Sequence, residues 1–279
     1  MSTGKFLTLQ EAADHLGVHY MTVYRYVRTG RIAAELRGSR WVVPAGDLSN
    51  LRPSRATPGR RAAGDTAVSR ETVDRLVARL TAGDEAGAWD IVQELLARGA
   101  TPGAVYLGAF CPALVAIGAA WANDEMTVAD EHQASVVVQR LIGRLGPLFR
   151  TRGPRVGTVV IGAPAGEMHA LPTALVADIL RAQRFRVLDL GADVPADAFT
   201  KCAFEVDALT AVVVSVTQRR HARRARNLIA ALRAGGVTAP IVIGGAGVSE
   251  RDVGALGADH MAATTEDLLS VLTRQVGRA

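Results

Sequence analysis

The stretch VVIGAPAGEMHALPTALVADILRAQRFRVLDLGADVP, residues 159–195, decides the fold of this 279-residue chain. It begins with a short β-branched run, 159–161, of the kind found in buried parallel strands. A loop, a helical pattern over 171–183 and a second apolar strand at 186–190 follow. The stretch therefore predicts a βαβ unit with His169 in the loop after its first strand. Open α/β sheets bind ligands at the carboxyl ends of their strands, which is where this loop would lie.

Two later strands are expected to end at the same edge. Strand 211–214 runs into Ser215 and Thr217, and strand 241–243 runs into the pair Gly244-Gly245. Strand and helix patterns alternate from residue 152 onward, which predicts a Rossmann-like α/β domain over 151–279. A lone histidine in a loop is most simply a solvated side chain. The hydroxyls and glycines at the same edge favour a ligand site instead.

This combination resembles the cobalamin-binding Rossmann-like domain of base-off, histidine-on corrinoid proteins. The residues that carry the resemblance are Glu167-Met168-His169, Ser215-Val216-Thr217 and Gly244-Gly245. It implies that His169 is the lower axial ligand of cobalt and that Glu167 supports its imidazole, as carboxylates do for other metal-bound histidines. It also implies that Ser215 and Thr217 hydrogen-bond the displaced dimethylbenzimidazole tail, which passes between strands beside the two glycines.

One position departs from that family. Pro172 stands where the family has glycine, which removes backbone flexibility beside the expected tail. Because proline is tolerated in the first turn of a helix, we expect the site to adjust rather than to be lost.

Residues 67–150 predict a four-helix bundle. Four helical patterns are separated by short loops, which is typical of an up-down arrangement. The third pattern is almost wholly apolar from Thr101 to Trp121. A helical bundle directly before a corrinoid domain resembles the cobalamin module of methionine synthase and the CarH/LitR-type photoreceptor repressors.

A short motif favours the photoreceptor relatives. CarH-like proteins carry Trp-x9-Glu-His with a valine inside it, and use it to cap the adenosyl group of adenosylcobalamin. The matching residues here are Trp121, Val128, Glu131 and His132. The alternative is a core tryptophan and a solvated Glu-His pair. In light-sensing members a histidine directly follows the tryptophan, whereas this chain has Ala122, so we expect a different photoproduct.

Residues 1–51 predict a winged helix-turn-helix domain. A capping box at Thr8–Glu11 starts one helix, a second is expected over 19–29, and segments 32–36 and 40–43 form a hairpin. The pattern resembles excisionase/MerR-type DNA-binding domains over about residues 5–50. By that resemblance the second helix enters the major groove and the hairpin holds the DNA backbone. The expected DNA contacts are Tyr20, Met21, Thr22, Arg25, Arg28, Arg37 and Arg40.

The charge distribution points to the same partner. The first 61 residues hold ten Lys and Arg against four Asp and Glu, whereas the remaining residues are close to neutral. Such an asymmetry favours a polyanion, here a double-stranded DNA operator, although helix-turn-helix domains also serve as protein-interaction modules. Residues 52–66, rich in Pro, Gly and Arg, are expected to form a flexible linker. A second basic stretch, 218–226, is interpreted as a solvated helix face, with a subunit or DNA contact as the alternative.

Composition bears on the compartment. No run of 18 apolar residues or signal-peptide pattern is present, so we expect no membrane association. Cys111 and Cys202 are interpreted as free thiols in a reducing cytoplasm.

Together these patterns predict a multidomain α/β protein: a winged helix-turn-helix, a four-helix bundle and a Rossmann-like cobalamin-binding domain. We expect a cytoplasmic, homo-oligomeric (dimeric or tetrameric) transcriptional regulator and not an enzyme. Its expected mode is light-responsive repression through adenosylcobalamin. The alternatives are a light-independent sensor of cobalamin, or of cobalamin and a bilin, and a corrinoid subunit of a methyl-transfer or radical enzyme.

Overall fold

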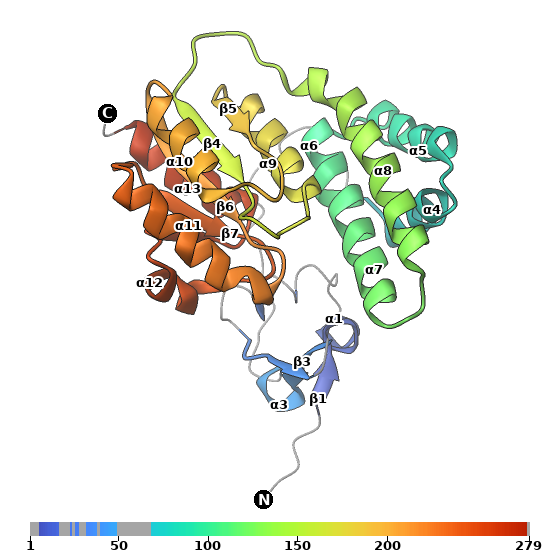
Figure 1. Ribbon diagram of the computed structural model, residues 1–279. Coiled ribbons are helices and arrows are strands. Elements are labelled where there is room, and N and C mark those ends of the chain that lie inside the picture. Colours follow the sequence, from blue (N-terminus) through green and yellow to red (C-terminus); the bar gives the residue numbers. More distant parts are fainter. Residues whose placement is uncertain are drawn as a thin grey trace, which may run out of the picture. The chain divides into compact units, whose positions relative to one another are not determined.

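The computed structural model describes residues 6–16, 23, 26–27, 32–37, 40–48 and 68–277. The chain divides into two compact units between Leu148 and Phe149. The helices and strands of each unit are labelled in Figure 1.

A five-stranded parallel sheet forms the centre of the second unit. Its strands are β4 (Thr158–Gly162), β5 (Arg186–Asp189), β6 (Leu209–Ser215), β7 (Ile241–Gly244) and β8 (His260–Ala262). They lie in the order β5-β4-β6-β7-β8, with every neighbouring pair parallel. In a doubly wound sheet of this order the direction of winding reverses between β4 and β6, which is where such sheets bind ligands. The predicted Rossmann-like arrangement is confirmed.

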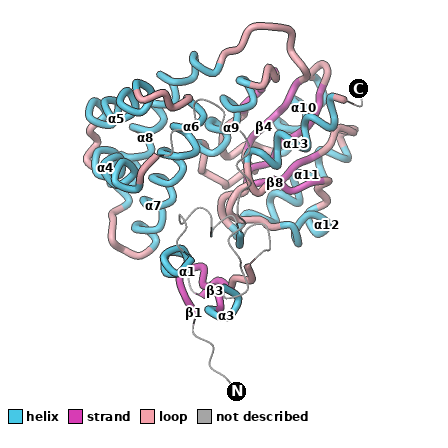
Figure 2. The backbone as a smooth tube through the Cα atoms, turned by 180° about the vertical axis from the view of Figure 1, so that it is seen from behind, coloured by secondary structure: helices cyan, strands magenta, loops and turns pink. Residues whose placement is uncertain are grey.

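Helices cover both faces of this sheet, as Figures 1 and 2 show from opposite sides. They are α9 (Leu171–Ala182), α10 (Ala196–Glu205), α11 (Ala222–Ala234), α12 (Val253–Leu256) and α13 (Thr265–Val276), with short 3-10 turns at Arg219–His221 and Glu250–Asp252. Successive residues of a strand point to opposite faces. Accordingly Val160 packs in the core that includes α10, α11 and α12, and Val159 in the core that includes α9 and α13. The strands are therefore apolar on both sides.

The predicted four helices are present in residues 70–145. They are α4 (Arg70–Thr81), α5 (Glu85–Ala97), a third helix made of α6 (Pro102–Val105), a π-helical turn (Tyr106–Phe110) and α7 (Cys111–Ala122), and α8 (Val128–Leu145). Side chains cap the starts of these helices at Ser69, Asp84, Thr101 and Thr127. The π-helical turn was not predicted. It contains the buried, stacked rings of Tyr106 and Phe110, and the Tyr106 hydroxyl donates to the carbonyl of Ile142 at 3.4 Å.

The helix Pro102–Ala122 is long and apolar enough to cross a membrane, judged by length and composition alone. This helix corrects the expectation that no apolar run of such length is present, because residues 102–122 contain only hydrophobic residues, glycine and proline. Core helices of bundles meet the same criterion, and Val105, Ala109 and Ile117 are buried within this unit.

The described part of residues 6–48 is a small antiparallel sheet with two helices. β3 (Arg40–Pro44) lies between β1 (Phe6–Thr8) and β2 (Glu35–Arg37), and α1 (Leu9–Leu16) and α3 (Ala45–Leu48) pack on the same core. The predicted capping box is formed, since the Thr8 and Glu11 side chains bond each other's backbone amides at 3.2 and 2.7 Å. The hairpin is formed but shorter than predicted, because Ile32 lies in a buried bend. β1 was not predicted. Most of the expected second helix lies outside the described residues.

We expect the bundle to depend on α8 residues that point inward. Leu141 is fully buried, whereas Val136 on the same helix is 49% exposed. Leu141→Ala should lower the free energy of unfolding by about 2–5 kcal/mol, because it leaves a cavity. The control Val136→Ala should change it by less than about 0.5 kcal/mol. Urea unfolding followed by circular dichroism measures both, and equal effects would contradict this packing.

Candidate functional site

The Glu167 carboxylate joins the loop after β4 to the segment after β6. One oxygen accepts from Nδ1 of His169 and from the His169 amide. The other accepts from the backbone amides of Thr217 and Gln218 at 2.9 and 3.1 Å. The side chain of Glu167 is fully buried. A buried carboxylate needs this many donors, because an unpaired charge in the interior is costly.

His169 is held in one orientation by this contact. Its side chain is 40% exposed, while the carboxylate behind it is fully buried. With Nδ1 engaged by Glu167, the other ring nitrogen, Nε2, is the atom placed to bind a metal. The described residues contain no cluster of three or more His, Cys, Asp or Glu side chains that could hold a metal ion. His169 therefore suits a metal that brings most of its own ligands, as cobalt in a corrin ring does.

The charge state of Glu167 follows from the same contacts. Burial acts to raise the pKa of this carboxyl, but hydrogen bonds from His169 and from the amides of Gln218 and Thr217 outweigh it. They hold the pKa of Glu167 below its usual value. The carboxylate is thus ionised at neutral pH.

The predicted tail-binding residues lie at the ends of β6 and β7. Ser215 ends β6 and is buried, and it pairs in register with Gly244 at the end of β7. The Thr217 Oγ1 atom is buried without a hydrogen-bond partner among the described residues. A buried hydroxyl in that state points to a polar partner that is supplied by a ligand or by water. It fits the tail of a cobalamin.

The glycine pair is required by the backbone. Gly245 has φ +100°, and a Cβ placed there would lie 2.5 Å from the carbonyl oxygen of Val216. A Cβ on Gly244 would lie 3.1 Å from the carbonyl oxygen of Ala262. The ends of β6, β7 and β8 thus approach one another more closely than side chains would allow. Both positions therefore favour a residue without a side chain.

Pro172 lies in the first turn of α9, as expected. The turn is closed by Thr173, whose hydroxyl donates to the carbonyl of Ala170 at 2.8 Å. The helix begins normally, because proline lacks only an amide that needs no partner at this position.

Sequence reasoning missed the role of the loop after β5. That loop contains Asp193. Its carboxylate accepts from the Gly166 amide at 2.5 Å, and its own amide donates to the Glu167 carbonyl at 2.9 Å. It adopts φ +54°, a conformation that asparagine and aspartate tolerate better than most residues. The one sequence feature that could have indicated that Asp193 holds the loop of His169 is its place directly after Gly191-Ala192, at the end of a predicted strand.

The four predicted capping residues lie at the junction of α7 and α8. Trp121 is 41% exposed near the end of α7, and Val128 is 53% exposed at the start of α8. Glu131 accepts from the Ser135 hydroxyl at 2.9 Å and lies 2.8 Å from Nδ1 of His132. The alternative interpretation was a core tryptophan and a solvated Glu-His pair. Trp121 is exposed and is therefore not a core residue. The Glu131–His132 pair is partly solvated, as that alternative expected. Ala122 ends α7.

The predicted DNA contacts are only partly described. Tyr20, Met21, Thr22, Arg25 and Arg28 lie outside the described residues. Arg37 is exposed, pairs with Glu35 at 3.3 Å, and stacks 3.5 Å above the Phe6 ring centroid. Arg40 lies opposite it in the β2–β3 register.

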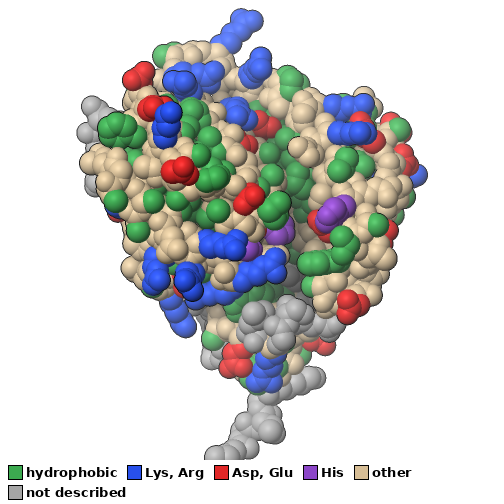
Figure 3. Space-filling view, in the orientation of Figure 1, with side chains coloured by type: hydrophobic (Ala, Val, Ile, Leu, Met, Phe, Trp, Pro, Cys, Tyr) green, Lys and Arg blue, Asp and Glu red, His purple; other side chains and the backbone are tan. Residues whose placement is uncertain are grey.

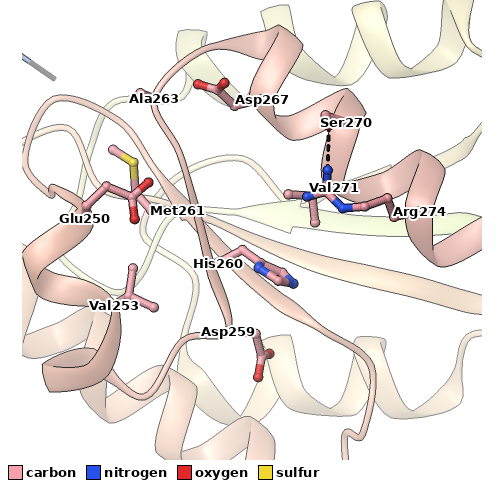
Figure 4. Close-up of a pocket in the computed structure, with 10 residues that line it drawn as sticks. All are labelled: Glu250, Val253, Asp259, His260, Met261, Ala263, Asp267, Ser270, Val271 and Arg274. Carbon is pink, nitrogen blue, oxygen red and sulfur yellow. Dashed lines mark hydrogen bonds between the residues drawn. The ribbon is translucent and has the colours of Figure 1, made fainter. Parts of the chain in front are cut away.

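A pocket of about 470 Å³ lies elsewhere in the second unit, beside β8 (Figure 4). It includes none of the predicted site residues, and its polar groups are largely engaged. Asp267 caps α13, Asp259 bonds the Ile241 amide, and Arg274 donates to the Ser270 hydroxyl at 2.7 Å. We therefore regard the edge formed by β4, β6 and β7 as the candidate site.

Glu167 should make stability depend on pH. Its folded pKa is lowered, so its contribution is present above the unfolded value and is lost as pH falls through the folded value. Glu167→Gln should therefore unfold more easily at pH 7 by about 1.5–3 kcal/mol, with the difference shrinking below about pH 4.5. Urea unfolding at pH 7 and pH 4 tests this, with the exposed Glu205→Gln as control. If the difference in unfolding free energy between the wild type and Glu167→Gln did not change with pH, the lowered pKa of Glu167 would be contradicted.

Comparison with known proteins agrees with this geometry. Residues 72–145 and 157–272 match two families that are each described as a B12 binding domain, and residues 6–51 match a helix-turn-helix domain family. A corrinoid protein of Desulfitobacterium hafniense is 23% identical over 174 residues, which cover 58% of this chain and 77% of that protein. Trimethylamine corrinoid protein 1 of Methanosarcina acetivorans is 29% identical over 126 residues, which cover 44% of this chain and 58% of that protein.

A solved structure shares the fold. The monomethylamine corrinoid protein of Methanosarcina barkeri superposes with a TM-score of 0.65 at 18% identity, covering 76% of this chain and 100% of that one. At that identity the likeness concerns the fold alone.

These comparisons correct one expectation. The sequence patterns predicted that the protein is not an enzyme. That prediction is contradicted by the curated relatives. They are corrinoid proteins and include several trimethylamine corrinoid proteins.

The two matched regions contain the helical bundle and the parallel sheet with its His169 edge. The third match precedes both and contains the small antiparallel sheet. This chain is a cobalamin-binding protein with a helix-turn-helix domain ahead of its B12 binding domains.

Proposed function

We propose that this protein is a cobalamin-dependent transcriptional regulator that binds operator DNA and responds to light. The observation that carries the proposal is the presence, in one chain, of a helix-turn-helix match and two B12 binding matches. A helix-turn-helix domain reads only a short half-site, so useful specificity needs two or more copies. The regulator is therefore a homo-oligomer that acts in the cytoplasm.

The residues of the sheet edge hold the corrinoid in this proposal. His169 binds cobalt through Nε2, and Glu167 keeps its ring in place and increases its basicity. Thr217 and Ser215 offer hydroxyls to the lower tail at the glycine pair. When bound, adenosylcobalamin supplies a cobalt–carbon bond that light can break.

Residues of the bundle read the upper ligand. Trp121 presents an exposed indole, a surface on which a nucleoside base can stack. Glu131 and His132 add hydrogen-bonding groups one turn into α8. A stacked base with polar contacts is a larger and more polar ligand than a methyl group. This residue set therefore favours the adenosyl form.

The comparisons favour a second candidate, a corrinoid protein that takes part in methyl transfer. Two named relatives, from Methanosarcina acetivorans and Methanosarcina barkeri, are trimethylamine corrinoid proteins. In that case His169 and the sheet edge serve the same purpose, and the helix-turn-helix domain is a protein-interaction module. DNA binding by the purified chain separates the two candidates.

His169→Ala should abolish imidazole ligation of cobalt, and Glu167→Ala should weaken cobalamin binding by about 10–100-fold. The loss of a supporting carboxylate is smaller because the imidazole itself remains. Absorbance spectra and equilibrium dialysis with cobalamin measure both effects. His260→Ala on β8 is the matched control. An imidazole-ligated spectrum in His169→Ala would show that another residue is the lower ligand.

Green light should lower the DNA affinity of the adenosylcobalamin-loaded protein by about 5–150-fold, the usual range of coupling between two sites. The reason is that a ligand shifts an equilibrium only through contacts that differ between states, and loss of the upper ligand removes those made by Trp121 and His132. Gel-shift titrations in the dark and in the light measure this effect.

Trp121→Ala should reduce the light response while leaving His169 ligation intact. The control is Leu107→Ala, which changes an exposed apolar residue of the same long helix. Equal DNA affinity in dark and light, with photolysis verified by absorbance, would leave a light-independent regulator. Absence of DNA binding under both conditions would favour the methyl-transfer candidate.

A further inference from the structure

Five arginines lie within eight residues at the start of α11. All five are exposed, and Lys and Arg side chains gather over this helix in Figure 3. They are Arg219, Arg220, Arg223, Arg224 and Arg226, called here the α11 arginine cluster. The first two belong to the 3-10 turn that leads into the helix.

The cluster is on the side of α11 that faces away from the sheet. Ala225, Leu228, Ile229 and Leu232 are buried in the core, at the spacing that forms one face of a helix. The arginines occupy the remaining positions of the first turns. Packing in the core therefore does not explain their number, although Arg224 also contacts the loop after β4.

Few acidic groups compensate this charge. No Asp or Glu occurs between residues 208 and 249. Within the described parts of the chain the cluster makes one salt bridge, from Arg219 to Asp252 at 2.5 Å. Arg224 donates instead to the carbonyl of Ala165 at 3.0 Å, and Arg220 to Nε2 of His221 at 3.1 Å. These contacts orient guanidinium groups without neutralising them.

The placement of these arginines in the first turns of α11 also destabilises the helix. The first turn of α11 contains no acidic residue. Positive charges there oppose the helix dipole, and like charges three or four residues apart repel each other. Residues whose local preferences oppose the observed structure are typical of functional positions. A bound polyanion would remove both penalties.

We propose that the α11 arginine cluster is a second DNA-contact surface, which binds the phosphate backbone without reading sequence. Arginine suits this role because its planar guanidinium can pair with a phosphate through two hydrogen bonds. The inference rests on the proposed function in one respect, that duplex DNA is the partner. The cofactor domain itself then holds DNA, in addition to the helix-turn-helix domain.

The test removes two charges that no described salt bridge uses. The full-length, cobalamin-loaded protein with Arg223→Gln and Arg226→Gln is titrated with operator-containing and unrelated duplex DNA by fluorescence anisotropy over a series of salt concentrations. The slope of log affinity against log salt should fall by about two, since each phosphate contact contributes about 0.9. The loss should be the same for both DNAs, because phosphate contacts carry no sequence information.

The matched control is Arg150→Gln with Arg152→Gln, which removes two exposed arginines from the segment before β4. It should leave the slope unchanged. Cobalamin spectra and circular dichroism should be those of the wild type in both double variants. A wild-type slope in the α11 variant overturns the inference alone, and absence of DNA binding by the wild type overturns the proposed function. If the α11 variant lost binding to phosphatidylserine vesicles but kept its DNA binding unchanged, the inference would be overturned in favour of a membrane surface as the partner.

Discussion

The buried carboxylate of Glu167 is the contact on which the candidate site depends. It fixes the imidazole of His169 on one side and accepts from the amides of Thr217 and Gln218 on the other. One side chain thus joins two strand ends that are about 50 residues apart in sequence. Because the charge is buried, it is stable only while all these donors are in place. The orientation of His169 and the position of the segment after β6 are therefore coupled through this carboxylate.

The sheet supplies the frame for this contact. The order β5-β4-β6-β7-β8 makes β4 and β6 neighbours and places β7 next to β6. The loop that carries His169 is held on its other side by Asp193 after β5. Where β6 and β7 end, Gly245 removes the side chain that would strike the Val216 carbonyl. The edge is consequently rigid and narrow, which is what positioning a large cofactor requires.

The remaining parts of the chain distinguish the candidate functions. A corrinoid module of this fold suits a methyl carrier as well as a sensor, and the curated relatives are corrinoid proteins. The exposed indole of Trp121 and the helix-turn-helix match favour a sensor that reports to DNA. The arginines of α11 add a charge pattern that packing in the core does not explain. The DNA partner proposed above would account for both basic regions.

Much of this organisation was predictable from local patterns. Apolar β-branched runs predicted the four strand positions named at the outset, and the helical patterns of residues 67–150 predicted the four helices of the bundle. The candidate site residues were predicted from the motifs after each strand, which are short and continuous, and their role in binding a ligand stays a prediction. These patterns depend only on residues that are close together in the sequence, so they can be recognised without a structure.

Tertiary structure decided the rest. β1, the π-helical turn at Tyr106–Phe110 and the role of Asp193 depend on partners far along the chain, and no local pattern encodes them. The bonds from Glu167 to the amides of Thr217 and Gln218 are of the same kind, since every residue carries an amide and only the fold selects which ones meet a carboxylate. The sequence by itself determined the strands and helices around His169 and predicted that residue as a cobalt ligand. The packed sheet determined how that residue is held.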